Sequence, residues 1–230
     1  MEKVNFKMSL FVESLKVEVR DHFVLKHPWL LAKSESMGID DLRLWLSQEY
    51  FVSIGFIDWF LRVASLTKNQ SAKIVLVENI WEELGEGKLE ETHVSILTDF
   101  LKKLDIDVNG LHALPETKEY LGEMEEIIGK SFFYGLGALG PANEYLLKLE
   151  YAKISNAYFL LKKDLDLPEG KFFQVNLDAD EGHSKRLFNL IDSICISESE
   201  KAEVIKGNRL ALQARVKFYD GLERIRISTS

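Results

Sequence analysis

Residues 172–190 combine apolar side chains with groups that could bind a metal ion. Read as a helix, this stretch places Asn176, Asp180 and His183 at steps of four and three, on the face that carries Phe173 and Leu187. A carboxylate and an imidazole three residues apart form a pair that binds divalent metals inside helical bundles. Such a pair also arises by chance on exposed faces, so a solvated pair remains an alternative interpretation.

Three other predicted helices show the same pattern, an ionisable residue on an apolar stripe. These residues are Glu83, His93 and Glu144, although a slight rotation of the first helix would turn Glu82 inward instead, and His93 could be a hydrogen-bonded core histidine. Buried ionisable groups without partners are costly, so they must satisfy one another or bind a cation. Two or three carboxylates with two imidazoles form the ligand set of carboxylate-bridged iron or manganese sites.

The elements that must position these groups are helices, because apolar residues recur at spacings of three and four almost throughout the 230 residues. We predict an all-α protein, with residues 1–230 forming a single domain of about eight helices. The predicted helices are 5–25, 40–66, 71–85, 88–104, 117–134, 141–164, 169–195 and 198–226, with a short helical turn near 28–36.

Composition narrows the class of partner. The formal net charge is −8 and Lys and Arg do not cluster, which argues against a nucleic-acid or anionic-membrane partner. Charged residues break up the N-terminal apolar residues, so we expect neither a signal peptide nor a membrane span, and a cytoplasmic location. The single cysteine, Cys195, lies between two isoleucines and is expected to be a buried, inert thiol.

The stretch "GLGALG" at residues 135–140 matches a dinucleotide-binding fingerprint in its letters. That fingerprint binds a pyrophosphate only between a strand and a helix, and no strand is predicted here. We interpret the glycines as a break or thinning of a helix that lets another backbone or a ligand approach, with Pro141 starting the next helix.

Several segments together resemble a known family. They are "HPWL" at 27–30, "QEYFVSIGFIDWFLRVA" at 48–64, "ENIWEELGEG" at 78–87, "GLGALGPANE" at 135–144, the D-x-x-H pair at 180–183 and "FYDGL" at 218–222. In order and spacing they resemble the TenA/PqqC superfamily, and within it the haem-oxygenase-like di-iron oxidase (CADD-like) branch. The resemblance implies a haem-oxygenase-like helical bundle and a possible homodimer.

The ligand pattern of that branch falls on Glu83, His93, Glu144, Asp180 and His183, the residues that periodicity had singled out. The sixth family position is a histidine four residues before the aspartate, and here it is Asn176. An amide oxygen is a weaker, neutral ligand for iron, so one of two metal positions should be weakened.

The resemblance therefore implies an oxygen-activating enzyme that uses one or two iron ions, with manganese as an alternative, and dioxygen to oxidise a small organic substrate. Glu83, Glu144 and Asp180 would act as catalytic carboxylates. Aromatic side chains could line the substrate pocket or simply form core: Tyr50, Phe51, Phe56, Trp59, Tyr151 and Tyr158. The alternatives are a metal-free PqqC- or TenA-like enzyme that binds a heteroaromatic compound, and a catalytically inactive binding protein.

Overall fold

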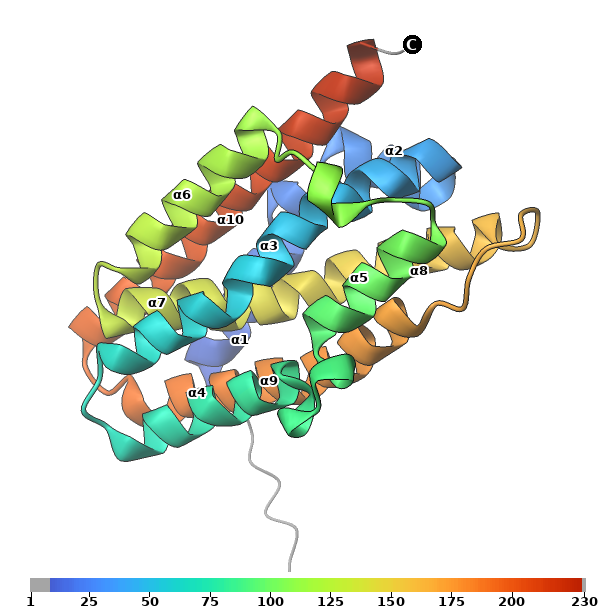
Figure 1. Ribbon diagram of the computed structural model, residues 1–230. Helices are drawn as coiled ribbons and strands as arrows, with labels where there is room; N and C mark the ends of the chain where they lie inside the picture. Colours follow the sequence, from blue (N-terminus) through green and yellow to red (C-terminus); the bar gives the residue numbers. More distant parts are fainter. Residues whose placement is uncertain (1–8, 229–230) are drawn as a thin grey trace, which may run out of the picture.

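The computed structural model describes residues 9–228, except for the side chains of residues 179–181, and within this range the chain forms helices and no strands (Figure 1). The all-α prediction is therefore confirmed. The α-helices are α1 (Leu10–Asp21), α2 (Pro28–Glu35), α3 (Ile39–Ser65), α4 (Gln70–Glu83), α5 (His93–Lys103), α6 (Pro115–Ile128), α7 (Phe132–Leu139), α8 (Leu146–Leu161), α9 (Lys171–Ile194) and α10 (Glu198–Ser228).

Local sequence explains most helix starts. The side chains of Ser9, Asn69, Thr92 and Ser131 accept hydrogen bonds from backbone N–H groups in the first turns of α1, α4, α5 and α7. Pro115 occupies the first position of α6, where its missing N–H costs nothing. The predicted helices 71–85, 88–104 and 117–134 begin within about five residues of α4, α5 and α6, whereas the start of α7 at Phe132 was not predicted. The first predicted helix, 5–25, begins before the described residues.

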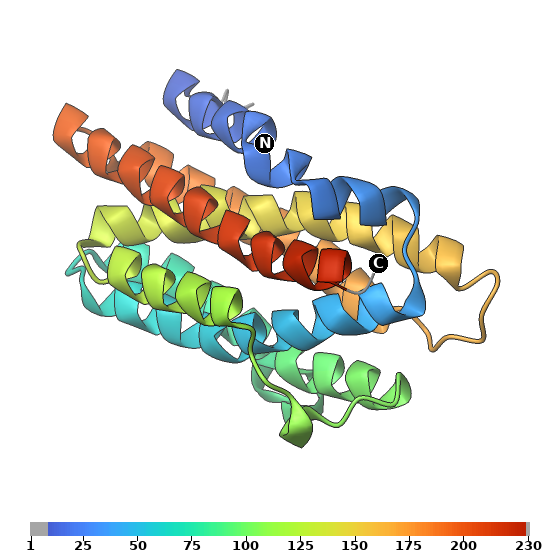
Figure 2. The same ribbon diagram turned by 90° about the horizontal axis from the view of Figure 1, so that it is seen from above.

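The helices lie side by side in a bundle (Figures 1 and 2). Their buried apolar side chains form one extended core. The long helix α10 lies against α6 and α7, and α3 packs on α4, α5 and α6. Helix α9 contacts α4, α5 and α8, and its His183 side chain lies beside Glu82 and Glu83 at the C-terminal end of α4. None of the described helices combines the length and apolar character that a membrane crossing requires.

The helix pattern around the glycine-rich stretch differs from the prediction. One helix was predicted over 117–134, but α6 ends at Ile128 and α7 begins at Phe132. A break was predicted before Pro141, but α7 continues through a π-helical segment, Gly140–Tyr145, into α8. The close approach itself is present: a Cβ on Gly137 would lie 2.0 Å from the Val204 carbonyl oxygen of α10. The wider π turn accommodates Pro141, which cannot donate the usual backbone hydrogen bond.

A tight turn connects the ends of α4 and α5. Gly85, Glu86 and Gly87 all have positive φ, and a Cβ on Gly85 would lie 2.5 Å from the backbone of Glu91. Glycine therefore suits this position, because only a residue without a Cβ lets the two backbones meet. As a result, the last residue of α4, Glu83, and the first residue of α5, His93, lie close together.

Candidate metal centre

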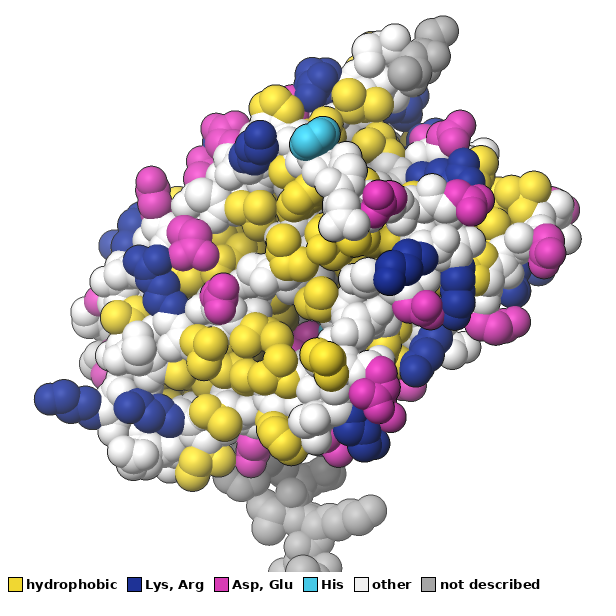
Figure 3. Space-filling view, in the orientation of Figure 1, with side chains coloured by type: hydrophobic (Ala, Val, Ile, Leu, Met, Phe, Trp, Pro, Cys, Tyr) yellow, Lys and Arg dark blue, Asp and Glu magenta, His cyan; other side chains and the backbone are white. Residues whose placement is uncertain are grey.

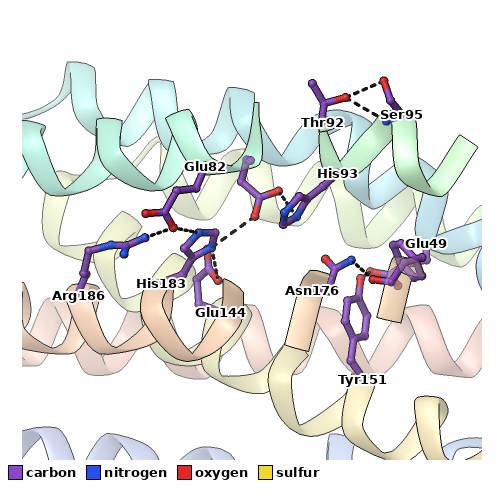
Figure 4. Close-up of polar contacts among 12 residues, drawn as sticks. Glu49, Glu82, Thr92, His93, Ser95, Glu144, Tyr151, Asn176, His183 and Arg186 are labelled. Atoms are coloured by element: carbon purple, nitrogen blue, oxygen red, sulfur yellow. Dashed lines mark hydrogen bonds and ion pairs between the residues drawn. The ribbon is translucent and has the colours of Figure 1, made fainter. Parts of the chain in front are cut away.

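Glu83 lies between two histidines. Its Oε2 atom is 2.9 Å from Nδ1 of His93, and its Oε1 atom is 3.4 Å from Nδ1 of His183. The two imidazole rings have centroids 6.5 Å apart and planes inclined by 20°, and they face each other from α5 and α9 (Figure 4). One carboxylate thus presents a different oxygen to each histidine, as a bridging ligand would.

Glu144 reaches the same place from the π-helical segment. Its Oε2 atom is 3.4 Å from Nδ1 of His183, and both residues are buried, with 1% and 0% of their surface exposed. Extra-residue turns of this kind recur at functional sites, where they turn a side chain out of the regular helical register. Four side chains predicted from apolar stripes therefore converge from α4, α5, the π-helical segment and α9.

The convergence of charges alters proton affinity. Burial raises the pKa of Glu144, against the opposing effect of His183. Burial alone would lower the pKa of His183, but the carboxylates of Glu144, Glu83 and Glu82 raise it to about 9. Without a metal, these carboxylates therefore favour the protonated form of His183, whose positive charge offsets their negative charge.

Glu82 and Glu83 were expected to be alternatives for the inward position, but both contact the histidines. Glu83 lies between His93 and His183, and the Oε2 atom of Glu82 is 2.9 Å from Nε2 of His183. The same oxygen accepts a hydrogen bond of 2.6 Å from Arg186, whose Nε donates to Asn79 Oδ1 at 2.9 Å. The Glu82 carboxylate thus fixes the far side of the His183 ring, so that Nδ1 faces the other carboxylates.

Asn176, the residue at the sixth family position, is also buried beside the site. Its NH₂ group donates to the Phe172 carbonyl oxygen at 2.7 Å, and in Figure 4 its amide oxygen is turned toward the side of His93. Asp180 belongs to α9, one turn from both Asn176 and His183. The Asp180 side chain lies outside the described residues, so its part in the site stays a prediction.

A small cavity adjoins these groups. Its free volume is about 30 Å³, and Glu83, His93 and Asn176 form one part of its wall. The remaining wall is mostly apolar and comes from α3, α5, α8 and α9: Glu49, Val52, Ser53, Phe56, Ile57, Val94, Leu147, Tyr151 and Phe172. Of the aromatic residues expected to line a pocket, Phe56 and Tyr151 do so, whereas Trp59 and Tyr158 are buried core residues and Tyr50 and Phe51 lie outside this lining.

The donor atoms fit a divalent transition metal. Nδ1 of His93, Nδ1 of His183 and Oε1 of Glu144 are buried, and none of them forms a hydrogen bond with the part of the chain that the structure describes. The two Nδ1 atoms have only the carboxylate contacts given above. An unpaired buried polar atom costs roughly 1–3 kcal/mol, and imidazole nitrogen with carboxylate oxygen is a donor set for iron and manganese. Among the side chains that the structure describes, Asp180 excluded, no three His, Cys, Asp or Glu residues are spaced to hold an ion.

A second buried polar cluster was missed by the sequence analysis. Arg215 of α10 donates to Glu49 of α3 and to Glu150 of α8, and Tyr151 donates to Glu49. Glu49 sits on an apolar stripe of α3 with Trp45 and Val52, the same signal that identified Glu144. Cys195 is buried, as predicted, and burial raises its pKa to about 12.

Comparison with protein families gives a match over most of the chain. The model described as "Iron-containing redox enzyme" matches residues 43–216. The chain is 25% identical to the 4-aminobenzoate synthase of Nitrosomonas europaea over 224 residues, which cover 92% of this chain and 90% of that protein. It is 23% identical to the 4-chloro-allylglycine synthase of Streptantibioticus cattleyicolor over 220 residues, which cover 94% of this chain and 83% of that protein.

Solved structures agree with the predicted fold. A CADD-like protein of unknown function from Nostoc punctiforme superposes with a TM-score of 0.79 at 19% identity, over 93% of this chain and 96% of that one. A domain with a haem-oxygenase-like fold from Shewanella denitrificans superposes with a TM-score of 0.72 at 16% identity, over 95% of this chain and 93% of that one. The expected haem-oxygenase-like fold and CADD-like resemblance are therefore confirmed.

Proposed function

We propose that this chain, which belongs to the family of iron-containing redox enzymes, is a non-haem iron oxidase that uses dioxygen to oxidise a small organic substrate. The observation that carries the proposal is the position of Glu83, with one carboxylate oxygen toward His93 and the other toward His183 inside a buried, partly apolar site. The names of the two synthases, each of which refers to a small organic product, support the proposed size of the substrate.

The contacts suggest how two metal positions would divide the ligands. His183 and Glu144 lie on the Oε1 side of Glu83, and we assign them with Asp180 to the stronger position. His93 lies on the Oε2 side, and the neutral amide oxygen of Asn176 is turned toward it, so this position should be weaker. Iron is the proposed metal, with manganese as an alternative because it accepts the same donor types.

Bound iron would supply the reduction of dioxygen and the oxidation of the substrate. The residues of the chain provide the surroundings. The carboxylates of Glu83 and Glu144 would balance the positive charge of the metal, and Glu82 holds the His183 ring so that Nδ1 faces the centre. Apolar side chains such as Phe56 and Leu147 limit the water beside the reacting atoms.

Anaerobic titration with Fe(II), followed by metal analysis and oxygen-consumption measurements, tests this proposal. We expect iron binding in the wild type, loss of that binding in Glu83→Ala, and normal binding in Glu90→Gln, a control variant of an exposed glutamate near the site. Trace metal content in the folded wild type after loading would contradict the proposal and favour a metal-free enzyme or a binding protein.

We also propose a homodimer that forms through α3 and α4. Exposed apolar residues follow helical spacing on both neighbouring helices: Ile54 and Leu61 on α3, and Ile74, Val77 and Trp81 on α4. Figure 3 shows apolar side chains gathered over this part of the molecule. Such contiguous patches mark interfaces more often than isolated apolar residues do.

Light scattering tests the proposed dimer. We expect a dimer for the wild type and for the control Leu160→Glu, which changes an exposed residue of α8, and a monomer for Trp81→Glu. A monomeric wild type would contradict this proposal.

A further inference from the structure

Glu49 is a buried carboxylate in the wall of the cavity that adjoins the candidate metal centre. It lies in the middle of α3 with 1% of its surface exposed, and Glu83, His93 and Asn176 line the same cavity. Figure 4 shows Glu49 with Tyr151 on the far side of Asn176 from His183. The cavity therefore has the candidate metal ligands in one part of its wall and a separate anionic group in another.

The Glu49 carboxylate is held in a fixed orientation. Its Oε1 atom accepts a hydrogen bond of 3.1 Å from the Tyr151 hydroxyl, and its Oε2 atom accepts one of 2.8 Å from Nη2 of Arg215. A carboxylate has about four lone-pair positions, so each oxygen can accept one more hydrogen bond. Glu49 is thus oriented before any ligand arrives, which reduces the entropic cost of binding one.

The charge around Glu49 is not balanced by Arg215 alone. Arg215 also donates to Glu150 through Nε at 3.1 Å and Nη2 at 2.8 Å, so Glu150 already pairs with this guanidinium. Glu49, Glu150 and Arg215 together carry one negative charge more than positive charge when both carboxylates are ionised. Burial raises the pKa of Glu150, Arg215 opposes this effect, and the negative charge of Glu49 adds to it.

The rest of the cavity wall would select the other part of a ligand. Apart from Glu49 and the candidate ligands, the wall consists mostly of aliphatic and aromatic side chains, among them Val52, Phe56, Leu147 and Phe172. Half-buried Ile57 and Val94 contribute to the same wall from α3 and α5. A molecule that fits this lining has an apolar body and a single cationic group.

We propose that Glu49 binds the protonated amino group of the substrate, so that the substrate is a small primary amine whose carbon chain extends from Glu49 toward Glu83 and His93. This inference rests on the proposed function, since it places the carbon atoms of the amine beside the metal centre. An ammonium group carries a positive charge, so it gains a Coulombic attraction to the ionised Glu49 carboxylate that a hydroxyl group lacks, and a buried site strengthens this attraction.

The test uses three probes of the same carbon skeleton: n-butylamine, 1-butanol and butyrate. Their dissociation constants are measured by ligand-observed NMR titration at pH 7.5, with the full chain treated with a chelator so that the amine cannot bind a metal directly. We expect the wild type to bind butylamine at least about tenfold more tightly than butanol, which corresponds to about 1.4 kcal/mol, and to bind butyrate most weakly.

Two variants locate the amine within the cavity. Glu49→Gln is nearly isosteric and should reduce the preference for butylamine over butanol to near unity. Glu83→Gln removes one negative charge from another part of the same cavity and should keep the preference. The opposite result, a preference lost in Glu83→Gln and retained in Glu49→Gln, would overturn the inference, because the amine would then bind at the metal ligands.

The wild type also decides the question by itself. Equal affinities for butylamine and butanol would overturn the inference even if Glu49→Gln did not fold, and a preference that survives Glu83→Gln would support it. Iron content, measured on separate samples of each protein, distinguishes a failure of the amine-binding inference from a failure of the proposed iron-oxidase function. A chain that binds no iron but binds butylamine through Glu49 contradicts only the proposed function.

Discussion

Replacement of Asn176 by histidine tests the proposed inequality of the two metal positions. The substitution restores an imidazole at the one family ligand position where this chain has an amide. We expect the wild type to bind one iron ion tightly and a second one weakly, and Asn176→His to bind both tightly. The expected change is in stoichiometry, from near one ion per chain to near two at the same free Fe(II) concentration.

The structure indicates the cost of this change without metal. The Asn176 amide loses its 2.7 Å hydrogen bond to the Phe172 carbonyl oxygen, a loss of about 1 kcal/mol. The larger ring must also enter a buried position, where overpacking typically costs about 1–3 kcal/mol. The adjacent cavity of about 30 Å³ provides part of the space. The metal-free variant should therefore be less stable than the wild type by about 2–4 kcal/mol.

Metal binding should recover this loss. A second ion at a free concentration one hundred times its dissociation constant stabilises the folded state by about 2.7 kcal/mol, which for a chain of this size raises the melting temperature by roughly 5–10 °C. Calorimetry under anaerobic conditions, with and without Fe(II), measures the difference. Asn176→Leu is the matched control, because leucine has a volume similar to that of histidine but no ligand atom. This variant should show only the stabilisation from the first ion.

Two results would refute this reasoning. Two equally tight iron sites in the wild type would mean that Asn176 does not weaken either position. A folded Asn176→His variant that still binds one ion would mean that residue 176 does not contribute to a metal position at all.

Three further predictions concern protons, ligand orientation and packing. The folded state raises the pKa of His183 from 6.5 to about 9, so the stability that its protonation provides is present below pH 6.5 and is lost as the pH rises through 9. The melting temperature of chelator-treated protein should therefore fall over this range. A flat profile would contradict the raised pKa of His183. Glu82→Gln should weaken iron binding about 10–100-fold in the anaerobic titration, because the Arg186–Glu82–His183 contacts orient the ring, and unchanged affinity would show that the ring needs no such support. Gly137→Ala should lower stability by about 1–3 kcal/mol or more in chemical denaturation, since its Cβ would lie 2.0 Å from the Val204 carbonyl oxygen, while Gly122→Ala, with no atom near its Cβ, should be neutral or slightly stabilising.

The local chemistry of the chain accounts for the predicted helices and their ends. Capping side chains such as Ser9 and Thr92 and the proline at position 115 act within one helical turn, so their effect can be read without knowledge of the fold. The same local rules placed a break at Gly140 and Pro141, and this prediction was wrong. The helix continues there, and Gly137 packs closely against Val204 of α10, more than sixty positions away in the sequence.

Helical periodicity identified ionisable residues on buried faces but could not identify their partners. Glu83, His93, Glu144 and His183 were recognised because each interrupts an apolar stripe. Glu49 interrupts a stripe in the same way and was overlooked, because a stripe shows that a residue is buried and does not show what it contacts.

The sequence by itself therefore determined the helical class and the family resemblance, and it supplied the candidate metal ligands. These features depend on spacing along the chain, which helix geometry converts directly into faces. Only the tertiary structure decided that Glu83 lies between the two histidines. The same is true of two long-range contacts: Glu82 meets His183, 101 residues away in the sequence, and Glu49 meets Arg215, 166 residues away. Such pairs arise from the packing of helices far apart in sequence, and packing depends on the fit of whole surfaces, which the spacing of residues along one helix does not record.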